Sequence, residues 1–230
     1  MRKRLLARSA AVFSVWMAFT SILVAGPKQE KKVREARWVY EQLFGNKQQT
    51  LPAALLADTK CIAVFPGVME AAFVFGGSHG TGVVSCRNDE GFWSPPSFIK
   101  ISEGSFGFQI GFKASDLVLF FVSEQGANAL LEKRTSFGGA LSAAAGPYST
   151  RTGTTSDVEL NDDVYIYVQA SGLFAGASVE GLRIGVSPKA IRKYYGHYVW
   201  PGEILFDHIT PTTPPEADQF RQGLDNLPWE

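Results

Sequence analysis

The chain has 230 residues, of which 45% are hydrophobic and 19% are charged, a composition typical of a globular domain rather than of a disordered chain. This length suits one sizeable domain with its own core, and two domains would be cramped. The 22 Lys and Arg residues balance the 22 Asp and Glu residues, which argues against the basic face of a general nucleic-acid-binding protein, so we expect no nucleic-acid partner.

The first 25 residues have the layout of a secretory signal peptide, with a positively charged start and then an uncharged apolar run from Ala10 to Ala25. We predict cleavage after Ala25. The mature chain then carries a net charge of −4, because this segment holds four of the 22 basic residues and none of the acidic ones. The alternative is an uncleaved anchor, but an apolar run of about 16 residues is short for a membrane span of about 20. The segment therefore predicts an exported protein, periplasmic or secreted.

An amphipathic helix is predicted over residues 28–44, because Val33, Ala36, Tyr40 and Leu43 recur at helical spacing. The same region is rich in Lys and Arg. Two interpretations stay open: a basic helix that contacts anionic headgroups, or an ordinary solvated face on a helix that packs against the core. A short helical piece with Pro52 in its first turn is predicted over 51–57.

From residue 61 the pattern changes to strands, because aromatic and β-branched runs are repeatedly interrupted by glycine. Strands are predicted at 61–65, 71–75, 81–86, 98–102, 106–112 and 117–123. Cys61 opens the first of these runs and Cys86 closes the third. Neighbouring strands would bring the two cysteines together, either as a disulfide or as two buried thiols, and the sequence leaves both possibilities open.

The second half of the chain alternates between helices, strands and segments of small residues. We predict a helix at 127–132, a Gly, Ala, Ser and Thr-rich stretch at 136–157, strands at 164–169 and 173–186, and a helix at 188–195 that begins with Ser187-Pro188. Residues 211–230 are acidic and proline-rich and are predicted to form a loose tail. The expected fold class is α+β: a single β-rich domain of mostly antiparallel strands with flanking N- and C-terminal helices.

Catalytic motifs are weak in this sequence. Residues 76–80 match the G-x-S-x-G pattern around Ser78, but a strand rather than a helix is predicted to follow, so a hairpin turn is the simpler interpretation. The three histidines stand in separate contexts and form no metal-ligand set with the two cysteines. We therefore predict no catalytic residue, no metal and no cofactor.

Several distinctive segments follow one another along the chain: Ile62-Ala63-Val64-Phe65-Pro66, Phe73-Val74-Phe75-Gly76-Gly77, Trp93-Ser94-Pro95-Pro96, Gly107-Phe108-Gln109-Ile110-Gly111, Ala144-Ala145-Gly146-Pro147 and Tyr194-Tyr195-Gly196. Their order resembles the SYLF domain family over about residues 30–209. This resemblance implies a non-enzymatic domain that binds phospholipids, often phosphoinositides in eukaryotic members, some of which also bind actin filaments. The chain departs from many relatives at Ser78 and Thr81 in the glycine turn and at Ala140.

These observations predict a signal peptide at 1–25, a SYLF-like lipid-binding domain at 26–209 and an acidic, proline-rich tail at 210–230. The expected partner is an anionic phospholipid membrane with which an exported protein associates peripherally. The alternative is a cell-envelope structural or protein-interaction module whose partners are envelope proteins. Actin is disfavoured, because an exported chain has no access to cytoplasmic filaments.

The candidate lipid-binding residues are mostly basic. Near an anionic surface each Lys or Arg contributes on the order of 1 kcal/mol, and tryptophan is favoured at the membrane interface. The candidates are Lys28, Lys31, Lys32, Arg34, Arg37 and Trp38 in the first helix, and Lys133, Arg134 and Arg151 inside the domain.

Overall fold

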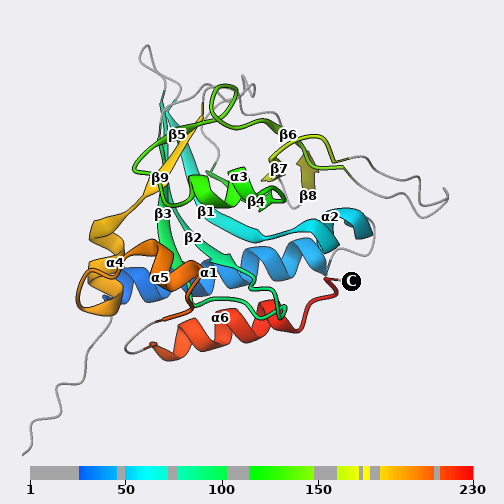
Figure 1. Ribbon diagram of the computed structural model, residues 1–230. Coiled ribbons are helices and arrows are strands. Elements are labelled where there is room, and N and C mark those ends of the chain that lie inside the picture. The colour runs from blue at the N-terminus through cyan, green and yellow to red at the C-terminus, as the bar shows by residue number, and fades with distance from the viewer. Residues whose placement is uncertain are drawn as a thin grey trace, which may run out of the picture.

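The computed structural model describes residues 26–45, 50–71, 77–102, 114–147, 160–170, 173–176, 182–209 and 213–229. In these ranges a curled, mostly antiparallel sheet is flanked by helices, which confirms the predicted α+β class (Figure 1). The strands are β1 (Cys61–Ala71), β2 (Gly77–Cys86), β3 (Ser97–Ser102), β4 (Ala114–Phe121), β5 (Thr135–Ser136), β6 (Ala143–Ala145), β7 (Val164–Ala170), β8 (Leu173–Gly176) and β9 (Arg183–Val186).

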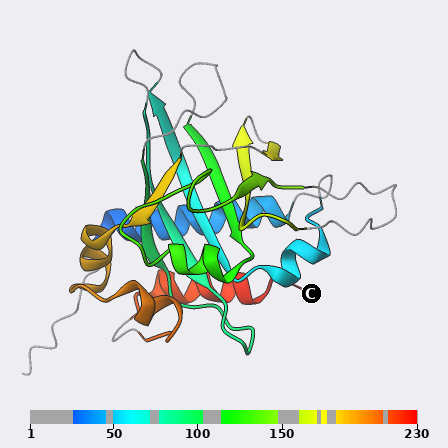
Figure 2. The same cartoon turned by 45° about the horizontal axis from the view of Figure 1, so that its top comes forward.

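The strands lie in the order β5-β9-β3-β2-β1-β4-β7-β6, and β8 pairs with β7. Only the β6–β7 pair is parallel among the described strands. The helices are α1 (Pro27–Phe44), α2 (Ala53–Asp58), α3 (Glu124–Ala129), α4 (Pro188–Tyr195), α5 (Pro201–Leu205) and α6 (Pro215–Asp225). α1 and α6 run along the same side of the sheet, as the turned view also shows (Figure 2).

The alternation of side chains along the strands produces a core on each face of the sheet, because successive residues of a strand point to opposite faces. In β1, Ile62 and Val64 pack toward α1, α4 and α6. Cys61, Ala63 and Phe65 belong to the second core, which residues of α3 help to cover. α1, α4 and α6 therefore share one face of the central strands, which brings α1 and α4 together, whereas α3 lies against the other face.

The hairpin of β1 and β2 answers two questions that the sequence left open. Cys61 and Cys86 are direct partners in its register and form a disulfide. Ser78 lies inside β2, in register with Glu70 of β1. A strand therefore runs through and beyond Ser78, so the strand-to-helix bend that a nucleophile elbow requires is not formed there. The hairpin turn predicted at residues 76–80 is wrong for residues 77–80, because these belong to β2.

Helix predictions were accurate for 28–44, 51–57 and 188–195, each of which agrees with an observed helix to within two residues. The helix predicted at 127–132 lies instead at Glu124–Ala129. The earlier start follows from an N-cap that the sequence interpretation missed, because the Ser123 hydroxyl accepts a hydrogen bond from the Gly126 N–H.

The prediction of a loose tail over 211–230 was wrong for its larger part, because Pro215–Asp225 form α6. Ala217, Phe220 and Leu224 are buried at helical spacing against α1. After the helix, the Trp229 ring packs on the rings of Phe44 and Trp93. A few apolar residues on one face of the helix are therefore enough to pack this acidic segment against the core.

Several predictions concern residues outside the described ranges. These are the segment 1–25, the strand at 106–112, residues 72–75 of the strand at 71–75, and residues 148–157 of the small-residue stretch. The strand predicted at 173–186 corresponds to two strands, β8 and β9, whose intervening residues 177–181 are also outside those ranges.

Candidate functional site

One flank of α1 carries basic residues that are paired with carboxylates. The Arg34 Nη1 atom lies 3.0 Å from the Glu216 Oε1 atom of α6, and the Arg37 Nε atom lies 2.6 Å from Glu41 Oε1. The hydrogen bond to Glu41 raises the pKa of Arg37. Lys31 is paired more loosely with Glu35, at 3.5 Å. We call Lys31, Arg34 and Arg37 the paired flank, and their field at a distance is reduced by the adjacent negative charges.

The other flank of α1 faces a cavity of about 330 Å³ that opens between α1, α4 and the strands β2 and β3. We call it the basic cavity. α1 contributes Lys28, Gln29 and Lys32, and α4 with its preceding turn contributes Ser187, Lys189, Ala190 and Lys193. The sheet contributes His79, Thr81 and Phe98. Four lysines from two helices far apart in the sequence thus line one cavity, and none of its lining residues is acidic.

Three of the four lysines of the basic cavity differ from the basic residues of the paired flank because they have no carboxylate partner among the described residues, whereas Lys32 has one. Lys32 donates to the Pro66 carbonyl at 3.0 Å and lies 3.0 Å from a Glu35 oxygen, so its charge is shared. Lys28, Lys189 and Lys193 form no ion pair within the described part of the chain. Both helices also begin at the cavity, and the partial positive charge of a helix N-terminus adds to the lysine field.

At the cavity, one backbone hydrogen bond joins the start of α1 to α4, and another joins the start of α4 to β3. The Gly26 N–H donates to the Lys193 carbonyl at 3.0 Å, and the Ser187 N–H donates to the Phe98 carbonyl at 2.9 Å. α4 presents its lysines outward because Ala190, Ile191, Tyr194 and Tyr195 form its buried face. The Tyr195 hydroxyl donates to the Pro96 carbonyl at 2.7 Å, and burial, followed by the neighbouring Tyr194, raises the pKa of Tyr195 and keeps this donor protonated.

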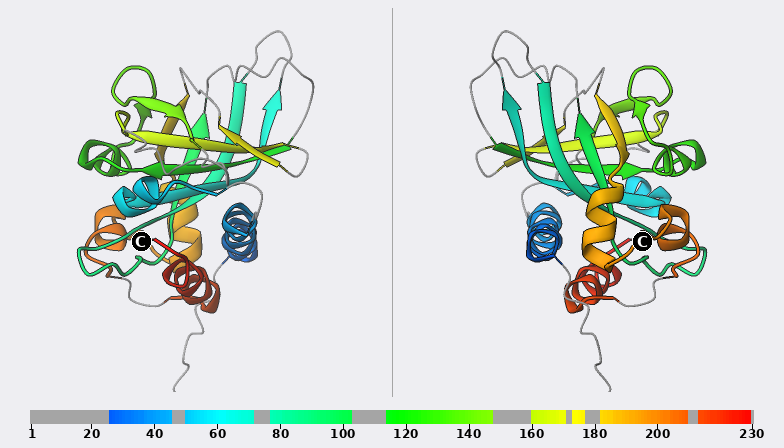
Figure 3. Two further views of the ribbon diagram at one scale, coloured as in Figure 1. Left: turned by 90° about the vertical axis from the view of Figure 1, so that its right-hand side faces the viewer. Right: turned by 90° about the vertical axis from the view of Figure 1, so that its left-hand side faces the viewer.

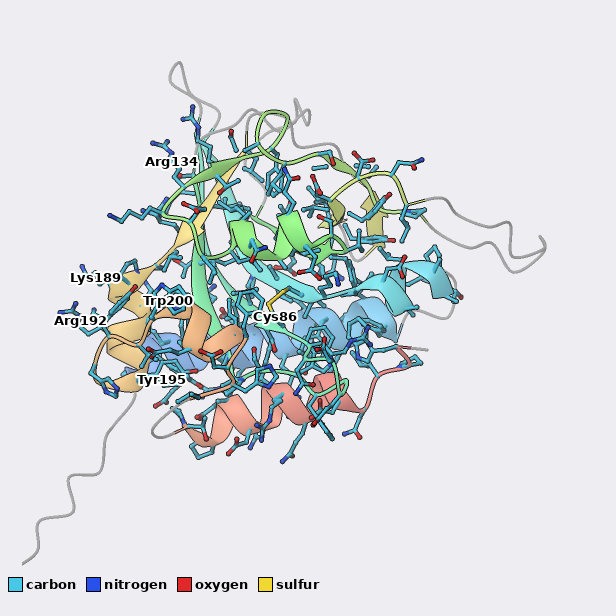
Figure 4. The ribbon with its side chains drawn as sticks, in the orientation of Figure 1. Cys86, Arg134, Lys189, Arg192, Tyr195 and Trp200 are labelled. Atoms are coloured by element: carbon cyan, nitrogen blue, oxygen red, sulfur yellow. A yellow bond between two sulfur atoms is a disulfide. The ribbon has the colours of Figure 1, made fainter. Side chains whose placement is uncertain are left out.

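Further basic residues lie on the same face of the sheet. Thr81 pairs in register with Lys100, and Lys100 pairs with Gly185, so these positions share one face. A side chain at position 185 would collide with the Lys133 carbonyl, so glycine allows residues 132–134 to cross β9 at this point. Lys100, Lys133 and Arg134 thereby line a second cavity of about 240 Å³. Figure 4 shows Arg134, Lys189 and Arg192 on one side of the molecule.

Trp38, predicted to settle at a membrane interface, is 54% exposed. It lies beside a shallow cavity that Glu35 and Asp116 also line. Its surroundings are therefore more acidic than those of the basic cavity. Arg151, the last of the predicted headgroup residues, lies outside the described ranges.

A group of exposed apolar side chains was missed in the sequence. Tyr198, Trp200, Phe206 and Ile209 follow α4 directly and are between 40% and 59% exposed. We call them the apolar corner. They were overlooked because the segment has no periodic pattern and lies beside prolines and acidic residues, although three aromatic residues within nine positions were a visible signal.

The described residues contain no group of three or more His, Cys, Asp and Glu side chains that could hold a metal ion. Among the described helices, none is long and apolar enough to cross a membrane.

Comparisons with known proteins agree with the resemblance seen in the sequence. The family model Ysc84, described as "Las17-binding protein actin regulator", matches residues 102–227. Protein YSC84 of Saccharomyces cerevisiae is 32% identical over 202 residues, which are 86% of this chain and 42% of that protein. The human SH3 domain-containing YSC84-like protein 1 is 32% identical over 178 residues, which are 77% of this chain and 51% of that protein.

LAS seventeen-binding protein 3 of Saccharomyces cerevisiae is 31% identical over 188 residues, which are 80% of this chain and 40% of that protein. The chain thus spans about half or less of the length of these relatives. It belongs to the Ysc84 (SYLF) domain family.

Proposed function

We propose that this domain binds the surface of anionic phospholipid membranes and catalyses no reaction. The single observation that carries the proposal is the convergence of Lys28, Lys32, Lys189 and Lys193 on one cavity whose lining includes no carboxylate. A cluster of like charges raises the free energy of the folded state unless counter-ions or an anionic ligand neutralise it. Phosphate groups of lipid headgroups are ligands of the required charge, and lysine ammonium groups bind them as point charges.

The expected strength follows from the number of lysines. Each basic residue near an anionic leaflet contributes on the order of 1 kcal/mol, so the three cavity lysines that form no ion pair among the described residues supply roughly 3 kcal/mol, enough for reversible peripheral association. The interaction is screened over a Debye length of about 8 Å at physiological ionic strength. Binding should therefore weaken strongly as salt is added.

Export to an oxidising compartment belongs to the same proposal. It is supported by the predicted signal peptide and by the Cys61–Cys86 disulfide, because disulfides persist mainly outside the reducing cytosol. In that compartment the membrane surface would be reached from the periplasmic or extracellular side.

The experiment that tests the proposal is co-sedimentation of residues 26–230, which contain every described helix and strand, with vesicles. One set of vesicles is pure phosphatidylcholine and the other contains phosphatidylserine, each at low and at high salt. We expect binding to the anionic vesicles that high salt weakens. Equal binding to both vesicles, or no binding to either, would contradict the proposal.

The names of the family and of its relatives favour a second candidate, a protein-interaction module related to actin regulation. The same purified chain can be co-sedimented with actin filaments in the absence of lipid. Saturable sedimentation with filaments, together with no sedimentation with anionic vesicles, would favour this second function over the first.

A further inference from the structure

The apolar corner is the largest gathering of exposed apolar side chains in the described part of the chain. Of six large hydrophobic residues exposed there, four fall within residues 198–209, whereas Trp38 and Phe92 each stand elsewhere. Scattered exposed hydrophobic residues need no explanation, but a contiguous group on a folded surface is typical of an interaction site.

The corner is held on a rigid base, so its exposure does not come from a loosely attached chain. Val199, Pro201, Ile204 and Leu205 are buried between the exposed residues. The Trp200 indole lies over Gly202, where a Cβ atom would collide with the ring. Backbone hydrogen bonds from Phe206 to Gly202 and from Ile209 to Glu203 close the segment.

α4 connects the corner to the basic cavity. α4 carries Lys189, Arg192 and Lys193 and leads directly into the segment that bears Tyr198 and Trp200. In the right-hand view of Figure 3, α4 lies between α1 on one side and α5 on the other. Figure 4 shows Trp200 on the side of the molecule that carries Lys189 and Arg192. α4 and its basic residues therefore lie between α1, which lines the basic cavity, and α5, which lies within the segment of the apolar corner.

We propose that the apolar corner enters the interfacial region of an anionic bilayer while the basic cavity faces its headgroups, so that α4 lies against the membrane. This inference rests on the proposed function and adds the orientation of the bound molecule. Tryptophan and tyrosine are favoured at the level of the headgroups, and adjacent basic residues match the charge of the leaflet. Glu203 and Asp207, exposed on the same segment, limit the insertion to this level.

In this orientation Trp200 contacts the membrane interface, whereas Trp38, the interfacial residue predicted from the sequence, does not. Trp93 and Trp229 are almost completely buried and provide a constant background. Residues 26–230 are mixed with phosphatidylcholine–phosphatidylserine vesicles whose acyl chains are brominated near the headgroup, and tryptophan fluorescence is measured. The variants Trp200→Phe and Trp38→Phe each remove one exposed indole and retain an apolar ring.

We expect bromine quenching of the parent protein and of Trp38→Phe, and loss of most of this quenching in Trp200→Phe. Quenching that is lost in Trp38→Phe and retained in Trp200→Phe would overturn the inference but leave membrane binding intact. If no variant sediments with anionic vesicles, the proposed function itself fails.

Affinity gives a second test. Trp200→Ser should weaken vesicle binding about tenfold, as expected when one large apolar side chain no longer leaves water. Trp38→Ser is the matched control and should bind like the parent. Near-ultraviolet circular dichroism of Trp200→Ser establishes that the fold is retained. Equal affinity of Trp200→Ser and the parent, with the fold retained, would overturn the inference.

Discussion

The two flanks of α1 carry the same kind of charge but stand in different electrostatic surroundings. On the paired flank, Arg34 meets Glu216 of α6 and Arg37 meets Glu41 one turn along the helix. On the other flank, Lys28 and Lys32 face the basic cavity, to which α4 adds two further lysines.

The number of basic residues in a helix therefore does not determine its attraction for anions. Glu41 of α1 itself and Glu216 of α6 neutralise charges on one flank, whereas α4 adds positive charge beside the other. On the paired flank, Arg34 also links α1 to α6, whereas Lys28 on the cavity flank forms no ion pair within the described part of the chain.

The largest expected effect is a loss of stability when the packing between α6 and α1 is disrupted. The Phe220 ring is fully buried and lies edge-on to the Tyr40 ring. The Tyr40 hydroxyl donates a hydrogen bond to the backbone carbonyl of Phe220 at 2.8 Å. Phe220→Ala should lower the free energy of unfolding by about 3 to 5 kcal/mol, measured by urea denaturation. The exposed neighbour Gln219→Ala is the control and should change it by less than about 0.5 kcal/mol. Vesicle affinity of the folded variant should be unchanged.

The next largest effect concerns binding. Replacing Lys28, Lys189 and Lys193 by Gln should weaken association with anionic vesicles on the order of 100-fold at low salt, because each of these lysines contributes about 1 kcal/mol. Replacing Lys31, Arg34 and Arg37 by Gln should change it less than about threefold, since these charges are already paired. Equal losses in the two variants would mean that net charge alone, rather than the cavity, determines affinity.

A smaller loss of vesicle affinity should follow when a carboxylate is introduced into the basic cavity, which would then resemble the paired flank. Gln29 lines the cavity, so Gln29→Glu should reduce vesicle affinity by about 1 kcal/mol, or about fivefold. Gln42→Glu introduces the same charge at an exposed position near the far end of α1. Sedimentation across a lipid titration compares the two, and a similar decrease in both would break the proposed distinction between the flanks.

The fold could be predicted from local patterns where those patterns were strong. The helical stripe of α1, the Ser-Pro start of α4 and the aromatic and β-branched runs of β1 to β4 all correspond to observed elements. α6 could not be distinguished from a loose tail, because its few apolar residues are buried only by packing against Tyr40 and the rest of α1.

The candidate site was predicted only in part. The basic character of α1 was visible, but the pairing of Arg34 with Glu216 spans 182 residues of sequence and has no local signal. Lys189 and Lys193 reach Lys28 and Lys32 only because β9 leads α4 back to the start of α1. Contacts between distant segments determine both features, and a single sequence does not reveal them.

The smallest effect is a dependence of stability on pH at the end of the apolar corner. His208 has a left-handed backbone, with φ of 54°, and its buried Nε2 atom meets no hydrogen-bond partner among the described residues. Burial first, and then the charge of Arg221 from α6, lower the pKa of His208, although the Leu205 carbonyl and the carboxylates of Asp207 and Asp225 oppose this. The folded protein therefore binds this proton less readily than the unfolded chain does.

Stability should consequently be complete above the ordinary histidine pKa of about 6.5 and decrease as the pH falls below it, since the unfolded state then binds more protons. Thermal unfolding at pH 7.5 and 5.5 measures the decrease. His208→Asn, which retains a residue tolerant of the left-handed region, should reduce the difference between the two pH values. If the variant loses as much thermal stability between pH 7.5 and 5.5 as the parent does, protonation of His208 does not cause the loss.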